Sequence, residues 1–262
     1  MGFDVVRDAD ARLSGDRMIV ASMATLPRRR DIALRAVASL LPQVDVLHLW
    51  LDKHSVAEGE LAEFEFCQLA SSLNVPWHRI GFARGDRGDG GKFAALGMLP
   101  DDAAWLVCDD DLRYPTDYVA RMFAALERVE ADGPCVVGLH ALRLPEQCKR
   151  YRDQRQHVQH CLRFETRPES VTRAHVLGTS SVITRPRYVR GFEAVDVADP
   201  PNVGDLHLAA WCERASVPRY CVPLPREGWL GNLLPDGAPS IWTDRATRNE
   251  NRVVQGVTWG AL

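Results

Sequence analysis

The order of apolar runs and amphipathic segments predicts an α/β protein with a mostly parallel sheet covered by helices. Short apolar runs alternate with helix-like segments, at residues 18–23, 44–51 and 104–108. The run at 44–51 is nearly continuous, as expected of a strand that is covered on both faces. The run at 104–108 leads into Asp109-Asp110-Asp111, and carboxylates at the end of a core strand indicate the sheet edge where ligands bind.

The other elements continue this alternation. Helical periodicity is expected at residues 29–41, 57–73, 116–130 and 205–215. Thr116 is the expected N-cap of the helix that it opens. Further strands are expected at residues 75–82, 135–139 and 176–184. A glycine-rich loop, residues 84–92, follows the strand at 75–82 and leads into a short helix.

The second half of the chain is less regular. Residues 143–173 contain eight Lys/Arg and four Asp/Glu. This composition fits either a mobile loop that handles an anionic substrate or a solvated excursion. From Pro223 onward there is no strong periodicity, so we expect an extension that wraps over the main domain.

Composition narrows the class of protein. With 262 residues and 46% hydrophobic content, the chain can form one large domain or a domain with a small lobe. A formal charge of -3 carries no signature of nucleic-acid binding. Seven scattered cysteines without a CxxC pair suggest free thiols in a reducing cytosol. We expect a cytoplasmic protein without a signal peptide or transmembrane segment, a description that still allows peripheral membrane contact.

The three adjacent carboxylates predict a metal site. Burying them without compensation would be costly, and a hard divalent cation removes that cost. Mg²⁺ or Mn²⁺ prefers carboxylate oxygens shared with substrate phosphates. The alternative is a solvated acidic turn.

Several short motifs, taken in order, resemble the GT-A fold glycosyltransferases, in particular the bacterial family 2-like enzymes. The resemblance covers residues 18–222. It rests on residues 21–29 (ASMATLPRR), 39–44 (SLLPQV), Asp52, 90–93 (GGKF), 109–115 (DDDLRYP), 177–181 (LGTSS) and 204–208 (GDLHL). It implies a GT-A-like Rossmannoid three-layer α/β/α fold with a less regular C-terminal part.

The resemblance also implies a division of the single domain. Residues 18–140 would form the half that binds the nucleotide sugar, and residues 141–222 the acceptor side. Residues 223–262 would form the C-terminal extension.

Site residues are implied by the same motifs. The donor-binding residues would be Thr25, Arg28, Asp52, Lys92, Asp109 and Asp110. Asp109 and Asp111 would hold Mn²⁺ or Mg²⁺, with Asp109 and Asp110 both open as the first aspartate of the DXD motif. The acceptor side would include Gly178, Thr179 and Ser180, and the catalytic base would be Asp205.

The chemistry needs these residue types. The diphosphate leaving group of a nucleotide sugar needs its developing charge neutralised, and the metal would supply that charge. An acceptor hydroxyl is a poor nucleophile near neutral pH, so an inverting enzyme needs a carboxylate within hydrogen-bond reach. The expected function is transfer of a sugar, of the hexosyltransferase type, from a UDP-sugar or related donor. The acceptor would be a glycan or lipid-linked hydroxyl in polysaccharide biosynthesis.

Two departures from the family pattern stand beside these expectations. Gly204 occupies a position where the family often has an acidic residue, and no histidine after His207 matches the one that completes the metal shell in some relatives. Both favour a glycosyltransferase-like protein that binds nucleotide or glycan without turnover. A nucleotidyltransferase or phosphatase with an acidic metal site is the other alternative.

Individual residues also have structural alternatives. Asp205 could be a helix N-cap, Asp52 could cap the turn after its strand, and Lys92 could be an ordinary exposed lysine.

Overall fold

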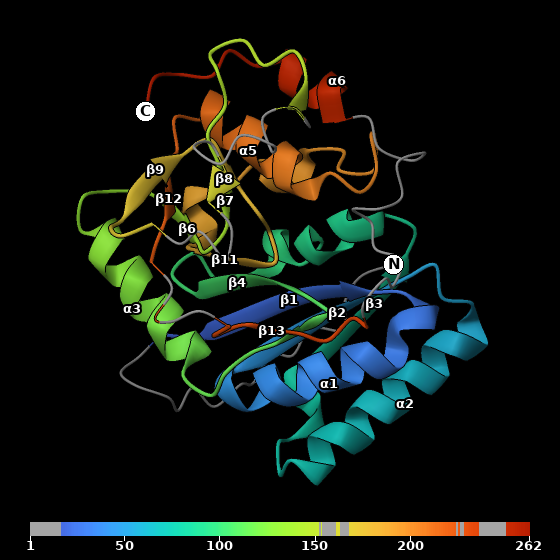
Figure 1. Ribbon diagram of the computed structural model, residues 1–262. Helices are drawn as coiled ribbons and strands as arrows, with labels where there is room; N and C mark the ends of the chain where they lie inside the picture. Colours follow the sequence, from blue (N-terminus) through green and yellow to red (C-terminus); the bar gives the residue numbers. More distant parts are fainter. Residues whose placement is uncertain are drawn as a thin grey trace.

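The computed structural model describes residues 17–151, 153, 161–162, 168–223, 225, 228–235 and 250–262. Its centre is an eight-stranded sheet in the order β3-β2-β1-β4-β11-β6-β12-β9 (Figure 1). The strands are β1 Ile19–Thr25, β2 Val46–Asp52, β3 Ile80–Gly85, β4 Ala104–Asp109, β6 Val136–Gly138, β9 Thr172–Ala174, β11 Ser181–Thr184 and β12 Arg219–Cys221.

The strand directions make the sheet mostly parallel. β1 pairs in parallel with β2 and with β4, and β2 pairs in parallel with β3. β11 is antiparallel to both β4 and β6, and β12 is parallel to β6. β6 and β12 therefore point in the same direction as β1–β4, while β9 runs against β12. The predicted α/β fold class is confirmed.

Helices cover both faces of the sheet. They are α1 Arg30–Leu40, α2 Val56–Ser72, α3 Tyr118–Glu130, α5 Gly204–Arg214 and α6 Glu250–Gln255. Figure 1 shows α1 and α2 on one side of the sheet and α5 on the other. Alternate residues of β1 enter two different cores: Ala21 packs with residues of α1, α2 and α3, whereas Val20 packs with Phe93 and with Leu208 of α5. The nearly continuous apolar character of the central strands follows from this burial on both faces.

Shorter elements complete the fold. A three-stranded sheet joins β10 Val176–Leu177, β7 Ala141–Leu142 and β8 Cys161–Leu162, and β13 Gly231–Asn232 pairs with β5 Leu112–Arg113. The 3₁₀ turns are η1 Pro27–Arg29, η2 Leu41–Gln43, η3 Trp77–Arg79, η4 Gly88–Phe93, η5 Leu96–Met98, η6 Pro186–Tyr188 and η7 Phe192–Ala194. No helix in the described part of the chain is both long and apolar enough to cross a membrane.

Three predicted boundaries are wrong, each for a local reason. β3 begins at Ile80 rather than at Val75, because the Val75 amide donates to the Ala70 carbonyl and completes the end of α2. Thr116 does not cap α3, which begins at Tyr118 after Asp117. The predicted strand at 176–184 is two strands, β10 and β11, separated by the turn at 178–180.

Part of the basic segment at 143–173 lies outside the described residues, namely 152, 154–160 and 163–167. Its two alternative interpretations stay predictions. The extension expected from Pro223 is also described only in part. Its helix α6 packs against α5 through Val254, in a buried cluster with Leu206.

Candidate active site

The parallel strands bring the predicted site residues to one edge of the sheet. In the β1–β4 register Ala24 lies opposite Asp109, and in the β2–β3 register Asp52 lies opposite Gly85. Because β11 is antiparallel, its first residue, Ser181, lies opposite Cys108 at the same edge. Carboxyl ends of neighbouring parallel strands are the common ligand-binding position in α/β sheets.

The three aspartates differ in exposure. The side chain of Asp109 is 37% exposed and that of Asp111 is 20% exposed, whereas that of Asp110 is 3% exposed. Asp110 therefore lies beneath the surface, and the other two carboxylates face the edge of the sheet. This arrangement differs from the solvated acidic turn that was the alternative.

Arg29 compensates the deeper part of the triplet. Its Nη1 lies 3.0 Å from Asp110 Oδ1, and its Nη2 donates to Asp111 Oδ2. Burial nevertheless raises the pKa of Asp110 to about 7, against the opposing effect of Arg29. Burial also raises the pKa of Asp111, and the neighbouring charge of Asp109 adds to that effect.

The sequence did not reveal the role of Arg29, since the resemblance implied a donor role for the adjacent Arg28. Arg28 is exposed, whereas Arg29 is partly buried in the turn η1. The only sequence signal was the run Arg28-Arg29-Arg30, which does not distinguish its members. Thr25, at the end of β1, is buried beside Asp110, and its hydroxyl helps to lower the pKa of that carboxyl against the larger effect of burial.

Lys92 is positioned by the glycine-rich turn η4. Its ammonium donates to Asp109 Oδ1 at 2.8 Å, and the side chain is only 4% exposed. The interpretation of Lys92 as an ordinary exposed lysine is therefore wrong. Burial alone would lower the pKa of Lys92, but the charges of Asp109, Asp89 and Asp205 outweigh it and raise the pKa.

The close approach of η4 to β2 requires glycine. A Cβ atom on Gly91 would lie 2.0 Å from Cδ1 of Trp50. Asp52 fixes the start of the loop, because its Oδ1 accepts hydrogen bonds from the amides of Arg87 and Gly88 at 2.8 and 2.9 Å. Asp52 therefore caps the turn after the neighbouring strand β3 and not, as the alternative had it, the turn after its own strand β2; its contact with a nucleotide stays a prediction.

The predicted acceptor-side residues lie next to the acidic strand end. Gly178, Thr179 and Ser180 form the turn between β10 and β11. The Tyr114 hydroxyl donates to the backbone carbonyl of Asp109 at 2.9 Å and contacts the carbonyl of Ser180 at 3.2 Å. Tyr114, a second residue without an assigned role, therefore joins the two sides of the site.

Asp205 lies in the first turn of α5. The N-cap of this helix is Val203, so the N-cap interpretation of Asp205 is wrong. Among the described residues, its Oδ1 accepts a local hydrogen bond, from the Leu206 amide at 3.0 Å. The amide of the preceding residue, Gly204, donates to Asp89 in η4 at 3.1 Å, so the start of α5 lies against the turn that carries Lys92. His207 is buried, with Nε2 at 3.0 Å from the Pro200 carbonyl, and is engaged in the fold.

The charge balance of this cluster fits a divalent cation. Among the described residues, the acids that interact electrostatically with the basic side chains Arg29 and Lys92 are Asp89, Asp109, Asp110, Asp111 and Asp205. Within the described ranges, no group of three or more His, Cys, Asp or Glu side chains is arranged to hold a metal by itself. Mg²⁺ sites commonly use one or two carboxylates together with substrate phosphates and water. The partly exposed Asp109 and Asp111 suit that kind of site.

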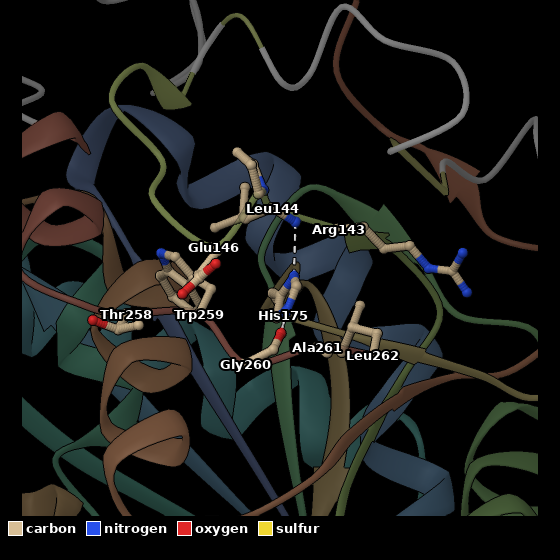
Figure 2. A pocket seen from close by; sticks show the side chains of 10 residues that line it. Arg143, Leu144, Glu146, His175, Thr258, Trp259, Gly260, Ala261 and Leu262 are labelled. Atoms are coloured by element: carbon tan, nitrogen blue, oxygen red, sulfur yellow. Dashed lines mark hydrogen bonds between the residues drawn. The ribbon is translucent and has the colours of Figure 1, made fainter.

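A separate cavity of about 730 Å³ lies at the C-terminal segment (Figure 2). It is lined by Arg143, Glu146 and residues 258–262, and by His175. Both ring nitrogens of His175 are engaged, Nδ1 by the Leu144 amide at 2.7 Å and Nε2 by the Gly260 carbonyl at 2.8 Å. None of the residues at the acidic strand end lines this cavity.

Comparisons with known proteins do not assign this chain to a family. No protein-family model matches the sequence, and no curated protein matches it. Among solved structures, the mannosyltransferase PcManGT of Pyrobaculum calidifontis, in complex with GDP-Man and Mn²⁺, aligns with a TM-score of 0.44 and 12% identity. The alignment covers 87% of this chain and 62% of that chain. A function for the present chain therefore rests on the side chains at its own sheet edge.

Proposed function

We propose that the protein is a metal-dependent, GT-A-like glycosyltransferase of the hexosyltransferase type. The observation that carries the proposal is the acidic end of β4 at the carboxyl edge of a mostly parallel sheet, where Lys92 donates to Asp109 and Arg29 pairs with Asp110 and Asp111. The donor would be a nucleotide-diphosphate sugar, with a UDP-sugar as the first choice. The acceptor would be a hydroxyl of a glycan or a lipid-linked glycan.

The donor side would work by charge neutralisation. Mn²⁺ or Mg²⁺, held by Asp109 and Asp111, would supply a Lewis acid to the diphosphate. Lys92 is almost fully buried, so its proposed contribution is to hold Asp109 in place and to reduce the net negative charge of the neighbouring carboxylates. Arg29 would do the same for Asp110 and Asp111 from the other side.

The acceptor side would work by general base catalysis. In the proposed inverting reaction, Asp205 accepts the proton of the acceptor hydroxyl while that oxygen attacks the anomeric carbon. The bond between the anomeric carbon and the diphosphate oxygen breaks, and the electron pair leaves with the nucleoside diphosphate. The turn at 178–180 would line the acceptor cleft beside Asp109.

The two halves would act as one catalytic domain, with residues 18–140 for the donor and 141–222 for the acceptor. Residues 223–262 would support the second half. A cytoplasmic site of action is part of the proposal, since the cysteines at 67, 108, 135, 148, 212 and 221 are free thiols.

The test is a transfer and donor-hydrolysis assay with a panel of nucleotide-diphosphate sugars and Mn²⁺. Asp205→Asn should lower turnover by roughly 10²–10⁴-fold, the usual effect of removing a positioned general base. Donor affinity should stay unchanged, because the proposed role of Asp205 concerns the acceptor. Asp132→Asn is the matched control, since Asp132 is exposed in the turn before β6, at the opposite edge of the sheet.

Release of nucleoside diphosphate by the wild type and its loss in Asp205→Asn would support the proposal. Normal turnover in Asp205→Asn would contradict the assignment of the base. No release from any donor, with nucleotide still bound, would favour a binding protein without turnover.

A further inference from the structure

The glycine-rich turn η4 is tied to the segment that leads into α5. The Asp89 amide donates to Asn202 Oδ1 at 3.3 Å, and the Gly204 amide donates to Asp89 Oδ2 at 3.1 Å. These partners are 113 and 115 positions apart in the sequence. Asp89 therefore joins the loop that carries Lys92 to the residue that precedes Asp205.

The packing at this junction explains the glycine at position 204. A Cβ atom on Gly204 would lie 2.8 Å from Cε2 of Phe93 and 3.1 Å from Oδ2 of Asp89. The first distance is shorter than real side chains show, so a larger residue would push η4 and α5 apart. An acidic residue at position 204 would therefore require Phe93 or the start of α5 to shift. The carboxylate beside Asp205 comes from Asp89 instead.

The junction also contains a buried carboxylate, that of Asp89, with one oxygen that lacks a hydrogen bond among the described residues. This oxygen is Oδ1, which is shielded from solvent. Burial raises the pKa of Asp89, and the charge of Asp205 adds to this effect, while Lys92 and the Gly204 amide oppose it. A buried carboxylate with an unsatisfied oxygen costs stability, and such costs are concentrated at functional sites.

Resting on the proposed function, we propose that Asp89 is a positioning residue for the transfer reaction. Through the Gly204 amide it holds the first turn of α5, and with it Asp205, against the loop that carries Lys92. Lys92 in turn is bonded to Asp109 at the donor side. Asp89 thereby fixes the distance between the donor-side carboxylates and the base, without touching the reacting atoms.

The test compares two substitutions of Asp89. Asp89→Asn keeps the size and an oxygen that can accept the Gly204 hydrogen bond, while Asp89→Ala removes the acceptor. Asp86→Asn is the matched control, because Asp86 lies on the same loop but is 75% exposed and pairs with Lys53 at 3.5 Å. The measurements are kcat, donor KM, melting temperature, and backbone hydrogen exchange at residues 204–206.

Asp89→Ala should lower kcat by roughly 10- to 100-fold, because small displacements of a catalytic group have effects of that size. Exchange at residues 204–206 should be faster, with donor KM unchanged. Asp89→Asn should restore the slow exchange and part of kcat, and Asp86→Asn should match the wild type. If Asp89→Ala does not fold, the comparison of Asp89→Asn with Asp86→Asn tests the proposal. A lower kcat is then expected in Asp89→Asn and not in Asp86→Asn.

Wild-type kcat and wild-type exchange in the Asp89 variants would overturn the proposal. A parallel fall in kcat, donor affinity and melting temperature would also overturn it, because it would indicate a general structural role. Failure of the wild type to bind any nucleoside diphosphate would contradict the proposed function alone. The exchange at residues 204–206 would still decide whether Asp89 holds the start of α5.

Discussion

Arg29 and Lys92 compensate the acidic strand end from opposite sides. Arg29 is 13% exposed and pairs with Asp110 and Asp111, while Lys92 is 4% exposed and pairs with Asp109. Removing one partner of a buried pair leaves an uncompensated charge, which costs more than the pair itself contributes. The buried Asp110 depends most on this compensation, because it is the least exposed of the three acids.

Arg29→Met should therefore lower the free energy of unfolding by about 3 kcal/mol at neutral pH. Arg28→Met is the matched control, and it should change stability by less than about 0.5 kcal/mol because Arg28 is exposed. Urea denaturation of the three proteins measures both values. Equal stability of the two variants would show that Arg29 does not compensate Asp110.

Several site residues could be predicted from the sequence because their positions follow from strand ends. Asp109 and Asp111 come at the end of the apolar run 104–108. Because the carboxyl ends of parallel strands meet at one edge of a sheet, both residues could be placed at that edge. The choice between Arg28 and Arg29 could not be made in the same way. Successive residues of a tight turn point in very different directions, and the sequence does not reveal which one faces the sheet.

At the scale of elements, the position of η4 depends on glycines that allow close contact with β2. Gly91 faces the Trp50 ring, and Lys92 follows it directly. A displaced η4 would move the Lys92 ammonium away from Asp109. The loop is therefore expected to be sensitive to any added side-chain atom.

Gly91→Ala should destabilise the protein by about 1–3 kcal/mol, the usual range for overpacking, and should weaken binding of a nucleoside diphosphate. Gly97→Ala is the matched control in η5, because its Cβ atom would lie at an ordinary 3.8 Å from the Glu193 side chain. Denaturation and calorimetry test the pair. Unchanged stability and affinity in Gly91→Ala would contradict the close packing of η4 on Trp50.

The core strands and helices could be predicted from periodicity, but several boundaries depend on tertiary hydrogen bonds. Val75 reads as a strand residue because it is apolar, yet its amide completes the end of α2. Asp117, and not Thr116, occupies the N-cap position of α3, but it makes no side-chain capping bond; its carboxylate accepts hydrogen bonds from Trp229 and Arg121. The separation of β10 from β11 requires the pairing of β10 with β7, which a local pattern does not show.

At the scale of the molecule, the sheet is covered on both faces and buries polar groups within its core. His48 of β2 is 9% exposed and packs against Gly81, where a Cβ atom would lie 2.8 Å from Nδ1 of the ring. Burial lowers the pKa of His48 to about 4 from an ordinary value of 6.5. Between about pH 4 and pH 6.5, His48 is therefore neutral in the folded protein, whereas the same side chain binds a proton in the unfolded chain.

This difference predicts a loss of stability on acidification. Because the pKa of His48 is lower in the folded state, its contribution to the free energy of unfolding is complete above pH 6.5. That contribution is lost as the pH falls toward 4. The loss should be about 2 kcal/mol between pH 7.5 and pH 5. Urea denaturation at both pH values should show a smaller loss in His48→Gln. Equal pH dependence in the two proteins would contradict this account of His48.

In the proposed function, the carboxylates at the end of β4 bind a nucleoside diphosphate together with a divalent cation. Calorimetric titration of UDP, with Mn²⁺ and then with a chelator, tests it most directly. The affinity should be at least about tenfold higher with Mn²⁺, a difference of about 1.4 kcal/mol. Asp111→Asn should remove most of that difference while the protein stays folded. Equal affinity with and without the metal in the wild type would contradict the claim.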